Sequence, residues 1–210
     1  MALCALLASA PCVHAASELG SALLARPNLV RGESLFEACA ACHQPDGSGQ
    51  ARGGIPILAG QHYQSILKEL VDFRSTRRLD VRMEAAASRH DLPNAQALAD
   101  VAGFIAAMPI ANTTDFGSGA HVEDGRAAYQ RNCADCHGAA GEGNGQKLYP
   151  RLGGQHYTYL LNQIDAMIGG YRFNVGQKHE QAIAGLADEE MTGIADYLAR
   201  LKIPPNHLKN

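Results

Sequence analysis

The sequence of 210 residues contains no tryptophan, and aromatic residues make up only 6% of it. So few rings leave space in a core that a large apolar cofactor could fill. No basic stripe is present and the formal net charge is −3, which argues against nucleic acid as a partner. Beyond the first residues, no apolar run is long enough to span a bilayer. With 46% hydrophobic and 19% charged residues, the composition is that of a soluble globular protein.

The N-terminus has the pattern of a secretory signal peptide. The segment from Leu3 to Val13 is mainly apolar, and Val13-His14-Ala15 places small residues where a signal peptidase cleaves. We therefore predict a signal peptide at residues 1–15 and export to the periplasm. The positive charge that normally opens such a peptide is missing, which is compatible with a start codon farther upstream. A short buried helix is the alternative.

Of six cysteines, two (Cys4 and Cys12) lie in the predicted signal peptide. The other four form two pairs, each followed directly by histidine: Cys39-Ala40-Ala41-Cys42-His43 and Cys133-Ala134-Asp135-Cys136-His137. Two thiols at this spacing reach both vinyl groups on one porphyrin edge, and the histidine then lies under the iron. A redox dithiol would not need that histidine, and a zinc site would need further ligands. The pattern predicts two covalently bound haem c groups, with His43 and His137 as proximal iron ligands.

The two motifs belong to a longer internal repeat, because Cys39 and Cys133 are 94 residues apart and the offset persists. The matching residues are Pro56 with Pro150, Leu58 with Leu152, and Gly60-Gln61-His62-Tyr63 with Gly154-Gln155-His156-Tyr157. Repetition at this length indicates two copies of one domain. We predict domains at residues 16–110 and 122–210, joined by a linker at 111–121 that is rich in Thr, Asn, Gly and Ser.

Apolar residues recur at helical spacing in both copies, and no run alternates convincingly enough for a strand. One helix in each copy follows the Gly-Gln-His-Tyr segment, and another closes the domain. The closing helices carry Leu98, Val101, Ile105 and Met108 in the first copy, and Met191, Ile194, Leu198 and Leu201 in the second. The sequence predicts an all-α fold of two tandem domains.

Each half resembles a class I cytochrome c in its order of helix, haem motif, Pro-x-Leu-x-Gly loop, helix, ligand loop and closing helix. The tandem pair resembles the di-haem cytochrome c4 family over essentially the whole mature chain. The resemblance implies two domains that meet across a pseudo-twofold interface, with electron transfer between their haems. It also implies that the carbonyls of Pro56 and Pro150 accept the second ring N–H of the proximal histidines. A plain loop proline is the alternative at each position.

The same resemblance implies that a methionine before the closing helix is the sixth ligand of the first iron. Met83 occupies that place, and a thioether ligand raises the reduction potential, as suits an electron carrier. Met108 lies on the apolar stripe of the closing helix and is better interpreted as core. His90 is a further alternative in this region.

The second copy departs from this pattern, because glutamine (Gln177) stands where the methionine should be. His179 lies two residues farther on and seven residues before Leu186, the separation that the family resemblance leads us to expect. We therefore predict His137 and His179 as the two axial ligands of the second iron, and a lower potential for that haem. Lys178, a methionine or an open sixth position are the alternatives.

These features predict an electron-transfer protein rather than an enzyme. Its partners would be redox proteins: a respiratory complex or a dehydrogenase as donor, and a terminal oxidase or reductase as acceptor. Docking would be transient, and peripheral contact with membrane complexes is compatible with this role. One alternative is a haem enzyme of the thiosulfate dehydrogenase or peroxidase type, with an open site on the second haem. The other is a fixed electron-transfer subunit of a larger oxidoreductase.

Overall fold

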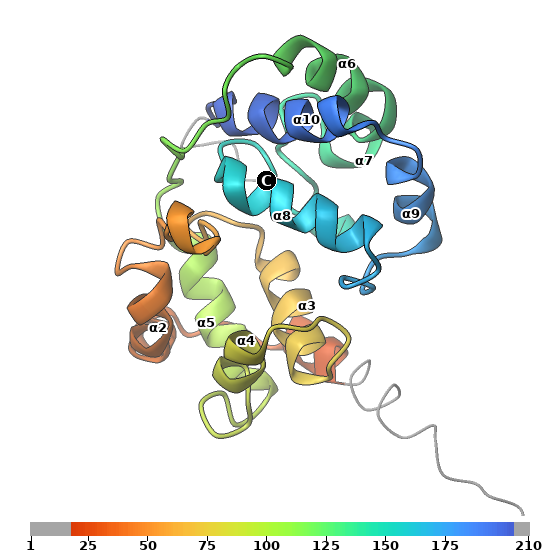
Figure 1. Cartoon of the computed structure of the whole chain (residues 1–210). Helices are drawn as coiled ribbons and strands as arrows, with labels where there is room; N and C mark the ends of the chain where they lie inside the picture. The colour runs from red at the N-terminus through yellow and green to blue at the C-terminus, as the bar shows by residue number, and fades with distance from the viewer. Residues whose placement is uncertain (1–17, 204–210) are drawn as a thin grey trace, which may run out of the picture.

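The protein consists of helices joined by loops in a computed structural model that describes residues 18–203. The predicted signal peptide, with Cys4 and Cys12, lies outside the described residues. Two groups of helices lie one above the other (Figure 1), and no strand occurs in residues 18–203 beyond two isolated bridges. The all-α fold of two tandem domains is confirmed. In the described range, no helix is both long and apolar enough to cross a membrane.

The helices of the two domains follow the same order along the chain. A short helix at residues 18–24 comes first. The first domain contains α2 (Leu29–His43), η1 (Ala51–Gly53), α3 (Tyr63–Arg74), α4 (Val81–Ala86) and α5 (Ala95–Ala107). The second contains α6 (Val122–Asn132), α7 (Ala134–His137), η2 (Gly145–Lys147), α8 (Tyr157–Ile168), α9 (Gln177–Ile183) and α10 (Asp188–Arg200).

In each domain the helix that leads to the haem motif crosses the closing helix at a glycine. A Cβ on Gly32 of α2 would lie 2.1 Å from the Asp100 carbonyl oxygen of α5. A Cβ on Gly125 of α6 would lie 1.8 Å from the carbonyl carbon of Gly193 of α10. Only glycine permits so close an approach of two backbones, and the crossing fixes where each helix delivers its cysteines.

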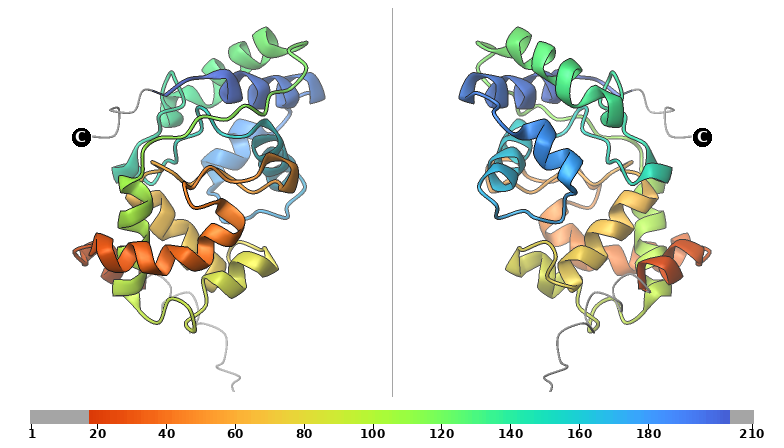
Figure 2. Two further views of the ribbon diagram at one scale, coloured as in Figure 1. Left: turned by 90° about the vertical axis from the view of Figure 1, so that its left-hand side faces the viewer. Right: turned by 90° about the vertical axis from the view of Figure 1, so that its right-hand side faces the viewer.

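The two domains lie against each other in both views of Figure 2, and residue pairs that match in the repeat join them by hydrogen bonds. The Nε2 of His62 donates to the Glu142 carbonyl at 2.8 Å, and the Nε2 of His156 donates to the Ser48 carbonyl at 2.9 Å. Because these are equivalent contacts in opposite directions, the interface has pseudo-twofold symmetry, as the family resemblance implies. One ring nitrogen of each histidine, Nε2, serves this interface.

The segment between the domains is bound to the second one. Thr113 donates its backbone N–H to the Gly154 carbonyl at 2.8 Å, and its hydroxyl contacts His156 Nδ1 at 2.6 Å. Asp115 accepts from the Thr158 N–H at 2.9 Å. The first residues of the predicted linker therefore belong to the surface of the second domain.

A largely buried carboxylate, Glu69, is shared between arginines of the two domains. Arg78 contacts it at 2.6 Å and Arg172 at 3.1 Å. The same two arginines donate to the amide oxygen of Gln163, the repeat equivalent of Glu69. Burial opposes ionisation of Glu69, but Arg172, Arg78 and Lys68 together lower its pKa to about 2. The cluster thus links the domains through charge.

Replacing Glu69 with glutamine is expected to lower the free energy of unfolding by about 3 kcal/mol at neutral pH, because two guanidinium groups lose their shared carboxylate. The Glu69 pKa is about 2 in the folded protein and near 4.5 in the unfolded chain. Its contribution is therefore complete above the unfolded pKa and is lost as the pH falls toward 2. Urea unfolding of both proteins near neutral pH and at about pH 3 measures this difference, which should shrink in acid.

Candidate haem sites

The four cysteines are placed at the ends of helices. Cys39 and Cys42 lie in the last turn of α2, whereas Cys133 stands at the junction of α6 and α7. All four thiols are free in the described structure. Burial raises the pKa of Cys39 and Cys133 to about 11, so both are protonated thiols at neutral pH. Reactive dithiols have lowered pKa values, so Cys39 and Cys133 lack the character of a reactive thiol.

The histidine of each motif is buried and held by a proline. The Nδ1 of His43 contacts the Pro56 carbonyl oxygen at 3.0 Å, and the Nδ1 of His137 contacts the Pro150 carbonyl oxygen at 3.0 Å. Because a carbonyl only accepts, Nδ1 carries the hydrogen and the Nε2 lone pair remains available to a metal. Burial lowers the pKa of both rings, which keeps them neutral.

The second domain brings His179 to face His137. Their ring centroids are 6.3 Å apart, and the ring planes are nearly perpendicular at 87°. Two metal–nitrogen bonds of about 2 Å, with about 1 Å from each nitrogen to its ring centre, span about 6 Å. The gap therefore fits one iron atom between the two rings. Burial, His137 and Arg172 lower the pKa of His179 to about 4, so its ring is neutral as well.

A shift of helix register explains how His179 reaches this position. In the repeat alignment α9 begins two residues later than α4. Met83 is the third residue of α4, and His179 is the third residue of α9. Gln177 and Lys178 are exposed. The structure thus places His179, and not the aligned glutamine, at the position equivalent to Met83.

Met83 is half-buried and packs against the core of the first domain. The Asp80 side chain caps α4 by accepting from the N–H of Met83 and of Arg82. Asp80 and Arg82 lie close enough to His43 to influence its pKa, so the start of α4 lies near that ring. His90 instead has a side chain 92% exposed, in contact with Asp91. Of these two candidates, only Met83 lies in an apolar environment.

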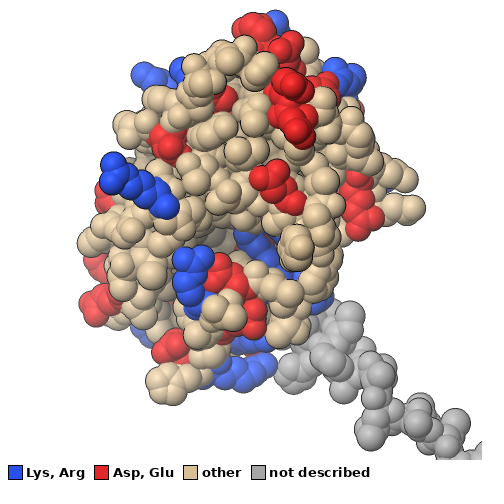
Figure 3. Space-filling view, viewed as in Figure 1, with Lys and Arg blue, Asp and Glu red and all other residues tan. Residues whose placement is uncertain are grey.

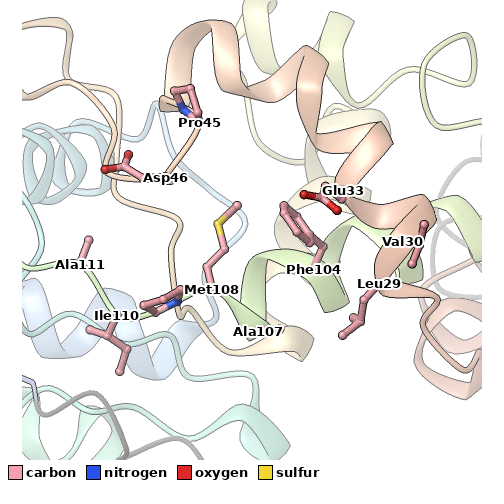
Figure 4. Close-up of a pocket in the computed structure, with 11 residues that line it drawn as sticks. Leu29, Val30, Glu33, Pro45, Asp46, Phe104, Ala107, Met108, Ile110 and Ala111 are labelled. Atoms are coloured by element: carbon pink, nitrogen blue, oxygen red, sulfur yellow. The ribbon is translucent and has the colours of Figure 1, made fainter.

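Met108 lines an apolar groove of about 600 Å³ beside Phe104 and Ile110, at the end of α5 (Figure 4). Its side chain also packs against the core of the first domain. A Cβ on Gly47 would lie 2.9 Å from the Met108 sulfur, so the sulfur packs beneath the loop that follows the haem motif. This packing agrees with its interpretation as a core residue.

Arg151 is a site residue that the sequence analysis missed. It follows Pro150 directly, is only 4% exposed, and its Nη1 makes no hydrogen bond within the described part of the chain. Burial lowers its pKa to about 10. A buried, incompletely paired cation beside a proximal histidine suits a carboxylate group of a porphyrin. No cluster of three or more His, Cys, Asp or Glu that could hold a metal occurs in residues 18–203.

Comparisons with known proteins agree with this geometry. The family model described as Cytochrome c matches residues 29–108 and 122–202. The thiosulfate dehydrogenase electron acceptor of Stutzerimonas stutzeri is 35% identical over 179 residues, which cover 78% of this chain and 79% of that protein. Cytochrome c4 of Pseudomonas aeruginosa is 30% identical over 182 residues, which cover 81% of this chain and 87% of that protein.

Two solved structures are also similar. Reduced recombinant cytochrome c4 from Pseudomonas stutzeri has a TM-score of 0.73 at 25% identity, over 84% of this chain and 100% of that one. A thiosulfate dehydrogenase from Marichromatium purpuratum has a TM-score of 0.72 at 28% identity, over 82% of this chain but 40% of that one. Together with the paired haem motifs, these matches show that the chain belongs to the cytochrome c family, as a di-haem electron-transfer protein of the cytochrome c4 type with two covalently bound haem c groups.

Proposed function

We propose that this protein is a periplasmic electron carrier with two differently ligated haems. Thioethers from Cys39, Cys42, Cys133 and Cys136 hold the porphyrins. His43 and Met83 are the axial ligands in the first domain, and His137 and His179 are those in the second. The observation that carries this proposal is the pair of neutral rings of His137, which is buried, and His179, which is half-buried, with centroids 6.3 Å apart.

The residues of the chain determine how such a carrier works. Haem, when bound, supplies an iron that changes its charge by one electron. The Pro56 and Pro150 carbonyls fix the tautomer and orientation of the proximal histidines, so the ligands need little rearrangement when the charge changes. With haem bound, Met83 and His179 would complete the ligand sets, so that no position would remain for a substrate. A thioether in one domain and an imidazole in the other make the potential of the first haem the higher one.

A periplasmic dehydrogenase is the electron donor that we propose. One relative is named a thiosulfate dehydrogenase electron acceptor, which supports an enzyme of that class as the donor. On the face that Figure 3 displays, Lys and Arg are scattered among Asp and Glu and form no broad basic field. A surface of mixed charge suits short-lived contacts with more than one redox protein.

A redox titration followed by absorption spectroscopy, with paramagnetic resonance of the oxidised protein at low temperature, tests the ligand sets. We expect two low-spin haems, of which only the haem with the higher potential has the far-red methionine–iron band. A high-spin haem that binds cyanide or carbon monoxide readily would contradict the carrier and favour an enzyme with an open iron.

Reduction by thiosulfate separates the carrier from the enzyme alternative. We expect thiosulfate alone to leave the oxidised protein unchanged, and thiosulfate with a catalytic amount of a thiosulfate dehydrogenase to reduce both haems. The described residues contain no cysteine outside the haem motifs that could ligate a catalytic iron. Reduction by thiosulfate alone would overturn the proposal. A stable complex with the dehydrogenase on gel filtration would instead favour a fixed subunit.

A further inference from the structure

Two buried glutamines reach across the domain interface in a reciprocal arrangement. The Oε1 of Gln155 accepts from the Ile57 N–H at 2.8 Å, and its Nε2 donates to the Ile57 carbonyl at 2.9 Å. Gln61 makes the same two contacts with Arg151, at 2.8 and 3.0 Å. Each glutamine thus binds both polar backbone groups of one residue in the opposite domain.

Each glutamine is also fixed by its own domain. The Oε1 of Gln61 accepts from the His62 N–H, and that of Gln155 accepts from the His156 N–H, both at 2.9 Å. The two residues are only 9% and 6% exposed. Water has little access to these amides, and neither amide can rotate without losing several hydrogen bonds. Each glutamine is therefore held in one orientation at the interface.

The residue that Gln155 binds follows the proline that holds His43. One peptide group, between Pro56 and Ile57, therefore makes two hydrogen bonds. Its carbonyl accepts from the His43 ring, and its N–H donates to Gln155. Hydrogen bonds at the two ends of a peptide group polarise it, so each strengthens the other. A side chain of the second domain thereby acts on the histidine of the first.

The peptide group after Pro150 joins His137 to Gln61 in the same way. We propose that Gln155 and Gln61 are positioning residues, each of which sets the donor strength of the proximal histidine in the opposite domain. The potential of each haem then depends on one residue from the other domain. This inference rests on the axial ligation by His43 and His137 proposed above.

The direction of the effect follows from the hydrogen bonds. Without the Gln155 amide, the Pro56 carbonyl becomes a weaker acceptor for the His43 ring. The ring then carries less electron density and stabilises the oxidised iron less well. Removing the glutamine therefore raises the potential of the haem in the opposite domain.

The test is a redox titration of Gln155→Met and Gln61→Met in the di-haem protein. Methionine keeps the length of the side chain and removes the amide. We expect Gln155→Met to raise the potential of the haem with the far-red methionine band, and Gln61→Met to raise that of the other haem. A shift in the haem of the same domain, an equal shift in both, or no shift would overturn the inference.

Tyr159→Phe is the matched control for a general loosening of the interface. The Tyr159 hydroxyl accepts from Arg78 at 2.9 Å across the same interface, but it contacts neither proximal histidine. We expect both potentials to stay unchanged in this variant. If it shifts a potential as much as Gln155→Met does, the effect belongs to docking of the domains, and the inference fails.

The ring proton of His43 gives a second, local readout by NMR of the reduced protein. Gln155→Glu keeps an acceptor for the Ile57 N–H and makes it stronger, while the donor to the Ile57 carbonyl is lost as it is in Gln155→Met. The His43 Nδ1–H resonance should move downfield in Gln155→Glu and upfield in Gln155→Met, while that of His137 stays in place. Equal behaviour of both rings would contradict the inference. If the unmodified protein lacks two low-spin haems, the proposed ligation fails instead.

Discussion

Replacing His179 with alanine is expected to convert one of the two haems from low spin to high spin and to leave the other unchanged. The His179 ring is neutral and faces His137 across a gap that fits one iron atom. Without the ring, the second iron keeps one protein ligand and becomes accessible to carbon monoxide. Paramagnetic resonance of the oxidised protein measures the converted fraction, which should be about half of the total haem.

Three further variants test whether the His179 side chain itself ligates the second iron. Lys178→Ala changes the exposed neighbour of His179 and should leave both haems low spin. His179→Met should restore six-coordinate iron with a higher potential, because a thioether replaces an imidazole. Met83→Leu should remove the far-red band and open the first haem only. If Lys178→Ala, and not His179→Ala, gives the high-spin haem, the assignment of His179 is wrong.

Alanine at Gly125 is expected to destabilise the second domain by about 3 kcal/mol or more. The new Cβ would lie 1.8 Å from a backbone atom of Gly193, so α6 and α10 must move apart. The crossing positions the helix end that carries Cys133, and its loss weakens the closure of the domain around its haem. Urea unfolding, monitored by haem absorption, measures the change in the free energy of unfolding.

Gly20→Ala is the control for this substitution. Gly20 lies in the helix at residues 18–24, and a Cβ there would meet no atom within 4 Å. Alanine has a better helix propensity than glycine. The free energy of unfolding of this variant should therefore equal that of the unmodified protein or exceed it by up to about 1 kcal/mol. Equal destabilisation by both variants would contradict the role of the close crossing.

The sequence alone predicted much of this protein, because covalent haem attachment needs a fixed local spacing. The Cys-x-x-Cys-His motifs and their repeat were sufficient to predict two tandem all-α domains with haem. The place of His179 also followed from the sequence, through the separation from Leu186 that the family resemblance implies. The electron-transfer function is confirmed by the comparisons, whereas the axial ligands stay a prediction.

Other parts of the sites could not be predicted, because they depend on contacts between residues far apart in the chain. Arg151 occupies the position of Ile57 in the repeat, so the difference between them was visible. The Arg151 side chain is buried, however, only because the two domains pack against each other. The reciprocal contacts of Gln61 and Gln155 depend on the same docking. Both glutamines were visible in the repeat, yet a helix-flanking Gly-Gln-His segment gives no local signal of a contact with another domain.

A very short segment of chain joins the two domains. Asn112 accepts from the Ile203 N–H, and Thr113 donates to the Gly154 carbonyl, so both belong to the second domain. Since Met108 still packs against the core of the first domain, residues 109–111 form the whole tether, and Met108 and Asn112 can lie about 14 Å apart at most. So short a tether gives the domains a very high effective concentration for one another. If the interface opens, for instance during docking of a partner, the tether should therefore make it close again quickly.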